Sequence, residues 1–257
     1  MTTTDLSEKT VLVTGALGAI AESVIRTLHE AGAFLVLTDL KTEEQAAEVL
    51  NAWKTTTRTS YYKMDVTNKE EVSDIVNTAF EKHPNINVAI GNAGGCGLHH
   101  FARTGAEEFD RVFKLNYTGQ TYFTRAVLDN WVRRNTKGHM VYTSSYVARV
   151  PHQGVPAYAS AKAALETFAK CLALEYAEQN IRFNVLSPGN VAAGSSLKVF
   201  NEDEEYREMV IRVTPLKRQN SPQAIANAFL YMCSDLAEEM NGHILNIDLG
   251  VTIPKIG

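Results

Sequence analysis

The sequence predicts an α/β fold in which one parallel sheet carries helices on both faces. Short apolar runs alternate with longer amphipathic stretches along the chain, a pattern typical of buried parallel strands joined by helices. The chain has 257 residues, and no internal repeat, low-complexity segment or linker divides it. We therefore expect one domain over residues 1–257, because α/β domains of this length often have a single core.

Seven short apolar runs are the expected strands, and helical stretches lie between most of them. The patterns Thr42-x-x-Gln45 and Thr67-x-x-Glu70 are typical of capping boxes, so they predict where two of the helices begin. The seven runs are Val11–Val13, Phe34–Leu37, Tyr61–Met64, Val88–Ile90, His139–Tyr142, Phe183–Leu186 and Ile244–Ile247.

The segment 188–220 is expected to be long and irregular. A loop of that length in a compact domain usually serves function, so we expect a lid over a substrate. Its acidic stretch Asn201–Glu208 is a candidate for a short helix. The segment ends at Ser221, whose hydroxyl would cap a helix with Pro222 at its first position.

Composition argues against several classes of function. A net charge of −4 and a pI near 6.0 argue against a nucleic-acid-binding surface. No apolar run reaches the roughly eighteen residues of a membrane span, so no membrane association is expected. The first residues, Met1 to Asp5, contain no basic or apolar run typical of a signal peptide.

The cysteines and adjacent histidines give no sign of a metal site. Cys96, Cys171 and Cys233 are odd in number and far apart, so a disulfide scaffold or zinc site is not expected and the cytoplasm is the expected location. Cys96 is interpreted as a small loop residue rather than a nucleophile. His99 and His100 would point apart on a regular element and have no evident carboxylate partner.

A glycine-containing turn follows the first strand. It includes Gly15, Leu17, Gly18 and Ile20 and leads into a helix. Such a turn brings backbone N–H groups and a helix N-terminus toward a pyrophosphate. We expect these four residues to bind a dinucleotide.

Carboxylates end the second and third strands. Asp39 can accept hydrogen bonds from the adenosine ribose and would repel a 2′-phosphate, which predicts NAD; a plain turn role is the alternative. Leu40 follows, and the nearest cation is Lys41. Asp65, followed by Val66, is expected to contact the adenine, although a turn or capping role is nearly as well supported.

Small residues follow the fourth strand. Asn92, Ala93 and Gly94 allow the backbone to come close to a flat ligand, although a bare turn is the alternative. These three residues complete the expected dinucleotide site in the first half of the chain.

Tyr158 and Lys162 lie four residues apart in an alanine-rich helical run, so they emerge on one helix face. A nearby ammonium favours the phenolate, so we expect Lys162 to lower the pKa of Tyr158. A phenol tuned in this way exchanges a proton with an alcohol or ketone. Ser145 ends the preceding strand, where its hydroxyl would bond the same substrate oxygen.

Together these motifs resemble the short-chain dehydrogenase/reductase family across nearly the whole chain. The resemblance implies one Rossmann-like domain with a doubly wound, seven-stranded parallel sheet. The matching positions, in order, are Thr14-Gly15, Asp39, Asp65-Val66, Asn92-Ala93-Gly94, Asn116, Ser145, Tyr158, Lys162 and Pro188-Gly189.

The resemblance also implies roles for the second half of the chain. Tyr158 would be the catalytic acid/base, with Lys162 holding the nicotinamide ribose. Ser145 would polarise the carbonyl, and Asn116 would support a proton relay through water. The strand end around Pro188, Gly189 and Val191 would complete the cofactor site.

The chain departs from the family pattern where the cofactor would bind. Ala19 and Ala21 stand where the family usually has glycine, and Ala193 stands where a threonine often contacts the cofactor. The two alanines in the turn support one rival, a dinucleotide-sensing or scaffold relative that has lost turnover.

The expected function is an NAD-dependent oxidoreductase acting on a secondary alcohol and its ketone. His152 and Asn190 are the expected substrate-binding residues beside Ser145 and Tyr158, although a surface position is an equal alternative for His152. Their polarity favours a polyol, sugar or hydroxy acid.

A ketoacyl-type NADPH reductase is the enzymatic rival, and Asp39 and the acidic stretch Asn201–Glu208 count against it. The four-residue spacing of Tyr158 and Lys162 counts against an enoyl reductase. The resemblance further implies a homotetramer packed through helices near Ala106–Arg134 and Ala157–Asn180.

Overall fold

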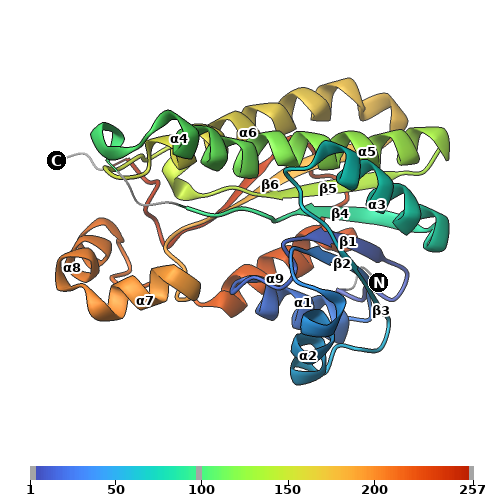
Figure 1. Cartoon of the computed structure of the whole chain (residues 1–257), viewed down its shortest axis with the longest axis horizontal. Coiled ribbons are helices and arrows are strands. Elements are labelled where there is room, and N and C mark those ends of the chain that lie inside the picture. The colour runs from blue at the N-terminus through green and yellow to red at the C-terminus, as the bar shows by residue number, and fades with distance from the viewer. Residues whose placement is uncertain (1–3, 97–99, 255–257) are drawn as a thin grey trace.

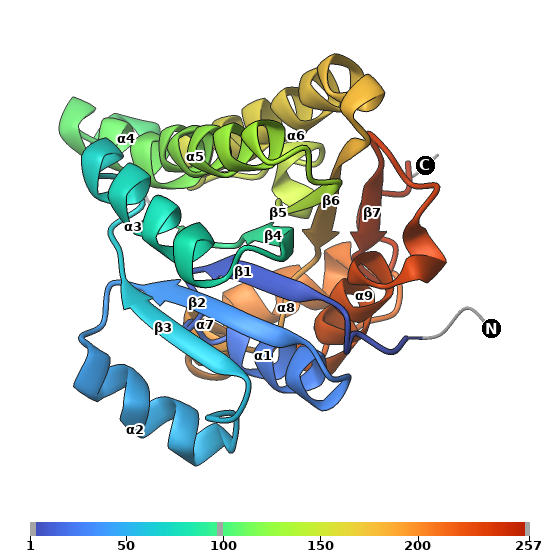
Figure 2. The same ribbon diagram turned by 90° about the vertical axis from the view of Figure 1, so that its right-hand side faces the viewer.

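One parallel sheet organises the molecule. The structure, a computed structural model, describes residues 4–96 and 100–254. Its seven strands all pair in parallel, in the order β3-β2-β1-β4-β5-β6-β7, and Figure 2 shows them from one edge to the other. The expected doubly wound sheet is confirmed. The strands are β1 (Thr10–Thr14), β2 (Phe34–Asp39), β3 (Thr59–Lys63), β4 (Ile86–Gly91), β5 (Gly138–Thr143), β6 (Ile181–Pro188) and β7 (Ile244–Ile247).

Helices cover both faces of the sheet (Figure 1). Helices α1 and α9 pack together on one face, and α3, α5 and α6 lie on the other. Each face has its own apolar core, with Ile25 and Phe229 in one and Phe80 and Trp131 in the other. The helices are α1 (Ala21–Glu30), α2 (Glu43–Trp53), α3 (Lys69–Lys82), α4 (Ala106–Phe113), α5 (Gly119–Arg133), α6 (Pro156–Glu175), α7 (Gly194–Glu202), α8 (Glu204–Val213) and α9 (Pro222–Cys233).

The strand order indicates where a ligand would bind. The chain moves outward from β1 to β3 and then returns to β4, which pairs with the other side of β1. Ligands of such sheets bind at the carboxyl ends of the strands, where the order reverses. The crevice is therefore expected beside the turns that follow β1 and β4.

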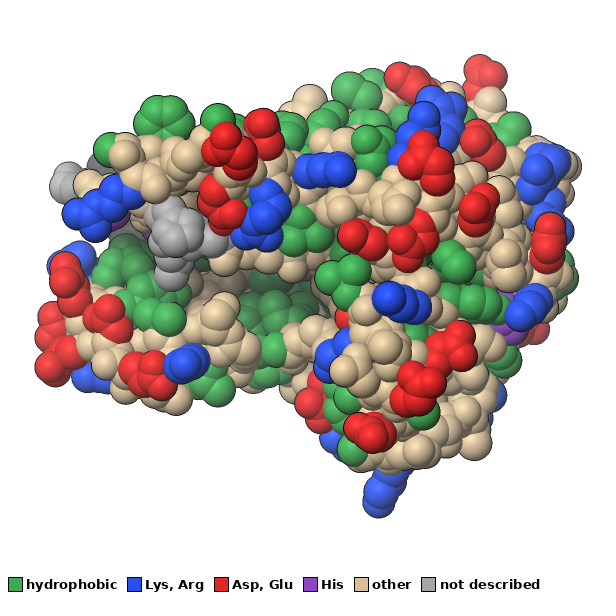
Figure 3. Space-filling model, viewed as in Figure 1, with side chains coloured by type: hydrophobic (Ala, Val, Ile, Leu, Met, Phe, Trp, Pro, Cys, Tyr) green, Lys and Arg blue, Asp and Glu red, His purple; other side chains and the backbone are tan. Residues whose placement is uncertain are grey.

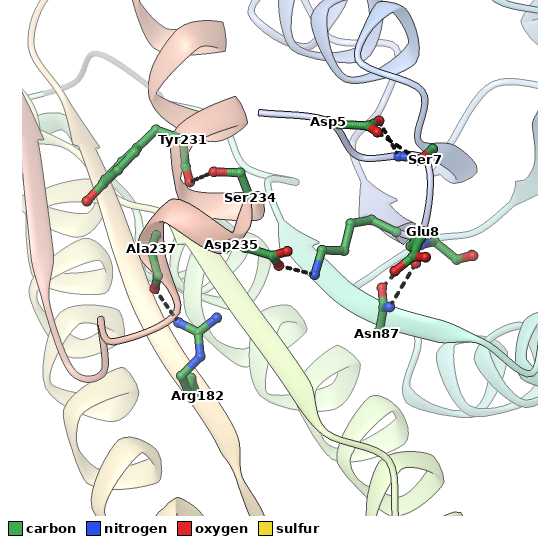
Figure 4. A network of polar contacts seen from close by, with 11 residues as sticks. Asp5, Ser7, Glu8, Asn87, Arg182, Tyr231, Ser234, Asp235 and Ala237 are labelled. Carbon is green, nitrogen blue, oxygen red and sulfur yellow. Dashed lines mark hydrogen bonds and ion pairs between the residues drawn. The ribbon is translucent and has the colours of Figure 1, made fainter. Parts of the chain in front are cut away.

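The opposite end of the sheet is closed by polar contacts (Figure 4). Asn87 donates a hydrogen bond to the carbonyl of Glu8, and Arg182 donates one to the carbonyl of Ala237. Lys9 pairs with Asp235 at 2.7 Å. These contacts tie the start of β1 to β4 and the start of β6 to the segment after α9, away from the crevice.

Two of the predicted helix starts are confirmed. In α2 the Gln45 backbone donates to Thr42 Oγ1 and the Gln45 side chain accepts from the Thr42 backbone, so the capping box is complete. In α9 the backbone of Ala224 donates to Ser221 Oγ at 3.1 Å.

The predicted capping box at Thr67 is wrong. Asn68 caps α3, because its Oδ1 accepts from the backbone of Glu71. The backbone and the hydroxyl of Thr67 instead donate to Asp65 Oδ1, each at 2.8 Å, so Thr67 belongs to the turn before the helix.

The segment 188–220 is not irregular, which corrects our expectation. It contains α7 and α8, and the acidic stretch Asn201–Glu208 is divided between them at Asp203. The Asp203 side chain accepts from the backbone of Tyr206, so it caps α8 and begins a new helix. Val210, fully buried, anchors α8 to the domain.

The long helix expected near Ala106–Arg134 is interrupted. A π-helical turn, Lys114–Thr118, separates α4 from α5. Such turns often occur at functional sites, and this one contains Asn116. Within the described ranges, none of the helices has the length and apolar character needed to cross a bilayer.

Candidate active site

A cavity of about 620 Å³ lies at the carboxyl ends of the strands. Figure 3 shows it as a hollow beside α7 and α8. Its lining joins the first half of the chain, with Gly15 and Asp39, to the second half, with Ser145 and Tyr158. Its volume falls in the range of ordinary ligand pockets.

The turn after β1 forms one wall of the cavity. Gly15 has φ of +60°, and a Cβ there would lie 2.7 Å from the backbone of Ala93. Only glycine fits, so two loops approach closely, which suits a dinucleotide pyrophosphate. Gly18 and Ile20 line the cavity with Ala19, whereas the side chain of Leu17 is buried outside it.

Asp39 holds its own turn and also lines the cavity. Its Oδ2 accepts from the backbone of Leu17 at 3.0 Å, and its Oδ1 accepts from the backbone of Leu40 at 2.8 Å. The carboxylate therefore holds the turn in place. Asp39 and Leu40 also line the cavity.

Asp65 has a turn role as well. Its Oδ1 accepts from both the backbone and the hydroxyl of Thr67, each at 2.8 Å. Asp65 and Val66 line the same end of the cavity as Asp39. This part of the lining thus contains two carboxylates that also shape their own loops.

Thr14 fixes the loop of small residues after β4. Its Oγ1 accepts from the backbones of Asn92 and Ala93, each at 3.1 Å. Asn92 donates to the carbonyl of Gly15 and accepts from Thr143 Oγ1. Asn92, Ala93 and the neighbouring Gly94 all line the cavity.

Asn116 is buried behind that loop. Its Nδ2 donates to the carbonyls of Gly95 and Val112, and its Oδ1 accepts from the backbone of Gly95 at 3.1 Å. A Cβ at Gly94 would lie 2.7 Å from Asn116 Oδ1 and 3.2 Å from Lys162 Nζ. The amide oxygen and the ammonium thus border the same glycine, and neither side chain lines the cavity itself.

Ser145, Tyr158 and Lys162 meet where β5 ends against α6. The Ser145 side chain hydrogen-bonds the phenol of Tyr158. Lys162 Nζ lies 5.5 Å from the centre of the Tyr158 ring and donates to the carbonyl of Thr143 at 2.8 Å. The spacing in the sequence thus brings these three groups together as predicted.

The expected lowering of the Tyr158 pKa is wrong for the chain without a ligand. Burial raises the pKa of Tyr158 above its usual value, and the bond from Ser145 opposes this only in part. Burial also lowers the pKa of Lys162 to about 8. Desolvation disfavours the charged form of both groups and outweighs their mutual attraction.

A buried network behind the site was not predicted. Ser144 Oγ donates to Glu166 Oε1 at 2.8 Å, and Arg149 Nε lies 3.6 Å from Glu166 Oε2. Arg149 also donates to Ser187 Oγ on β6. This network joins β5 and β6 to α6 one turn beyond Lys162, and it has no sequence signal because it depends on contacts between distant elements.

The strand end after β6 completes the cavity. Pro188, Gly189 and Val191 line it as predicted, together with Ala193, Ser195 and Ser196 at the start of α7. Asn190 and His152 also line it. The ring of His152 lies 6.1 Å from that of Tyr146, so His152 is part of the site rather than a remote surface residue.

Several lining residues were missed as site residues, and Cys96, Tyr146 and Tyr206 are three of them. Tyr146 directly follows Ser145, a signal that was available in the sequence. Burial raises the pKa of Cys96 to about 11, so it stays a thiol near neutral pH. Tyr206 lines the cavity because α8 packs beside the cavity, which the sequence alone did not indicate.

Histidine and acidic groups do not gather into a metal centre in the part of the chain that the structure describes. Over residues 4–96 and 100–254, no group of three or more His, Cys, Asp or Glu could hold a metal ion. His99 lies outside the described residues, and His100 is exposed.

Known proteins match nearly the whole chain. A family model described as enoyl-(acyl carrier protein) reductase matches residues 15–252. The 2,3-dihydro-2,3-dihydroxybenzoate dehydrogenase of Bacillus subtilis (strain 168) is 32% identical over 256 residues, covering 95% of this chain and 96% of that protein. A 3-oxoacyl-(acyl-carrier-protein) reductase of Thermotoga maritima is 27% identical over 248 residues, covering 96% and 99%.

A solved structure gives the same result for the fold. A short-chain type dehydrogenase/reductase from Mycobacterium marinum has a TM-score of 0.88 at 26% identity and covers 98% of both chains. The similarity extends over the sheet, the turn after β1 and the segment with α7 and α8.

Proposed function

Because the chain belongs to the short-chain dehydrogenase/reductase family, we propose that it is an NAD-dependent oxidoreductase that interconverts a secondary alcohol and its ketone. The observation that carries the proposal is the phenol of Tyr158, hydrogen-bonded to Ser145 and lining the cavity that also contains Asp39. A single cavity that contains both groups at the strand ends suits a dinucleotide.

Each residue of the site has a role in this reaction. A bound nicotinamide would accept or supply the hydride. In oxidation Tyr158 takes the hydroxyl proton of the substrate, and in reduction it returns a proton to the same oxygen. Ser145 donates a hydrogen bond to that oxygen. Because burial raises the pKa of Tyr158, its phenolate depends on the Ser145 bond and on the charge of Lys162.

Asn116 and Lys162 act behind the phenol. Lys162 is held by the carbonyl of Thr143, so its ammonium stays beside Tyr158 and near the place of the nicotinamide ribose. The Asn116 amide oxygen borders the same glycine as that ammonium. Asn116 is positioned to support a proton relay through water toward Lys162.

Asp39 favours NAD over NADP. A 2′-phosphate beside its carboxylate would meet a like charge, and Leu40 provides no cation to offset it. The same residue counts against a ketoacyl reductase that uses NADPH, although one relative has that activity in its name. The non-catalytic sensor remains the rival from another class, supported by Ala19 and Ala21.

Titration of the purified protein with NADH and NADPH, followed by fluorescence, is the first test. We expect NADH to bind at least about tenfold more tightly than NADPH. An alcohol screen with NAD then tests turnover, and Tyr158→Phe should lose turnover by a factor of about 10² or more while still binding NADH. Binding of neither cofactor would favour the scaffold, and a preference for NADPH would refute the role of Asp39.

We also propose a cytoplasmic homotetramer packed through α5 and α6. Apolar side chains on both helices support this, since Leu174 is 83% exposed and Val132 is 50% exposed in the single chain. Light scattering tests the assembly, and a monomeric mass would contradict it.

A further inference from the structure

A cluster of three polar side chains faces the substrate end of the cavity. Asn190 Oδ1 lies within hydrogen-bonding distance of the phenols of Tyr146 and Tyr206, at 3.4 Å and 3.5 Å. Asn190 is only 8% exposed, and its Nδ2 is buried and has no hydrogen-bond partner among the residues that the structure describes. Buried amide N–H groups are almost always paired, so this donor calls for an acceptor from a ligand.

The position of Asn190 is fixed by its backbone. Its carbonyl accepts from the backbone of Asn220 at 2.7 Å, and the neighbouring Val191 bridges to Asn220. A Cβ at Gly189 would lie 2.8 Å from Asn220 Oδ1, so the chain here leaves no room to shift. The amide of Asn190 is therefore held at a fixed position in the cavity wall.

The cluster lies beside the reacting groups. Tyr146 directly follows Ser145 in the chain, and both line the cavity with Tyr158. Tyr206 comes from the first turn of α8, on the opposite wall. A substrate oxygen at this cluster and another at Ser145 and Tyr158 would be a few atoms apart.

The chemistry of the cluster is neutral. Burial raises the pKa of Tyr146 to about 12, so its phenol keeps its proton. Among the described residues that line the cavity there is no Lys or Arg. A carboxylate buried here would lack a cation, whereas a hydroxyl or carbonyl oxygen needs only a neutral donor.

We infer that Tyr146, Asn190 and Tyr206 bind a second, non-reacting hydroxyl of a neutral diol or polyol whose first hydroxyl reacts at Tyr158. This inference rests on the proposed function and narrows it, because it excludes hydroxy acids. A small rotation of the Asn190 amide would let its N–H donate to the second hydroxyl, which can in turn donate to a tyrosine oxygen. A substrate with one hydroxyl would leave the amide unpaired.

The test uses cis- and trans-1,2-cyclohexanediol against cyclohexanol, which has the same ring and one hydroxyl. In the parent protein with NAD, we expect kcat/KM for the better diol to exceed that for cyclohexanol by about tenfold or more. In Asn190→Leu, a change of similar volume without the amide, this ratio should fall to about one. In Tyr206→Phe it should fall by about threefold, since one phenol is lost.

Binding provides a second readout that does not need turnover. Calorimetry of each diol with the NADH-loaded protein, which cannot oxidise it, should show weaker binding in Asn190→Leu, with NADH affinity unchanged as evidence of folding. Tyr231→Phe, at an exposed position of α9, is the matched control and should change neither quantity.

The outcomes separate the two proposals. Diol binding that depends on Asn190 without any turnover would contradict the oxidoreductase and support the cluster. Turnover with an equal diol-to-cyclohexanol ratio in the parent and in Asn190→Leu would overturn the cluster and support the oxidoreductase. Absence of diol binding to the parent protein, or tight binding of a hydroxy acid such as lactate in place of the diol, would also overturn it.

Discussion

The two walls of the cavity are held in different ways. On the catalytic wall, β5 and α6 hold Ser145, Tyr158 and Lys162 through buried hydrogen bonds from neighbouring strands. On the cofactor wall, Ala19 in the turn after β1 meets the segment that leads into α7. A Cβ at Gly194, where φ is +52°, would lie 3.0 Å from the Cβ of Ala19.

Because of this difference, we expect the catalytic wall to control turnover and the cofactor wall to control cofactor affinity. The catalytic wall keeps every residue of the family pattern and places it on regular elements, so small changes there should disable turnover. The cofactor wall departs from the family pattern at Ala19 and Ala193, which lie on two loops far apart in the sequence. Changes there should alter cofactor affinity and leave the reacting groups in place.

The largest effect is expected for Lys162→Met on the catalytic wall. Turnover should fall by a factor of about 10² or more, because the phenolate loses its nearby cation. Stability should rise at pH 7, by roughly 1–3 kcal/mol, because a buried cation whose pKa is lowered to about 8 is removed, offset by the loss of its bond to Thr143. Urea unfolding measures the second quantity.

The pH dependence of that stability gain follows from the direction of the shift. The folded pKa of Lys162 lies below its unfolded value, so the unfolded chain binds more protons between the two values. The stability cost of burying the charged Lys162 is therefore full below pH 8, and it fades as the pH rises toward the pKa of Lys162 in the unfolded chain. Lys170→Met, exposed on the same helix, is the control. A gain that persists undiminished above pH 10 would contradict the assignment.

A smaller loss is expected for Gly94→Ala. The new methyl would lie 2.7 Å from Asn116 Oδ1 and 3.2 Å from Lys162 Nζ, and Asn116 is held by the carbonyls of Gly95 and Val112. Displacing these groups should lower kcat by about tenfold to a hundredfold.

The adjacent Gly95→Ala is a matched control for that change. Among the described residues, a Cβ at Gly95 would meet only Leu115 Cδ2, at an ordinary 3.6 Å, so kcat should stay within about twofold of the parent value. Steady-state kinetics compares the two variants. Equal losses in both would mean that the loop, rather than the contact with Asn116, limits activity.

Prediction from sequence succeeded where the argument was local. The strand runs, the Thr42 and Ser221 caps and the four-residue spacing of Tyr158 and Lys162 are each decided within one or two turns of chain. The expected lowering of the Tyr158 pKa failed because burial is set by the whole fold. The contact of Tyr206 with Asn190 and the network around Glu166 were not predicted for the same reason, since the partners lie far apart in the sequence.

The smallest effect is expected for Ala19→Gly on the cofactor wall. Removing the methyl widens the approach to the pyrophosphate beside Gly194, so NADH and NADPH should both bind about twofold to threefold more tightly. Ala21→Gly is the control, because Ala21 also borders the cavity but is only 2% exposed, and its methyl packs against the core at the start of α1. That variant should lose roughly 0.5–1 kcal/mol of stability without a gain in affinity. Fluorescence titration of both variants measures the cofactor affinity. Tighter binding in Ala21→Gly alone would mean that the packing of α1, rather than Ala19, obstructs the cofactor. Unchanged binding in Ala19→Gly would mean that the cofactor wall accommodates its alanine and that the catalytic wall is the more sensitive of the two.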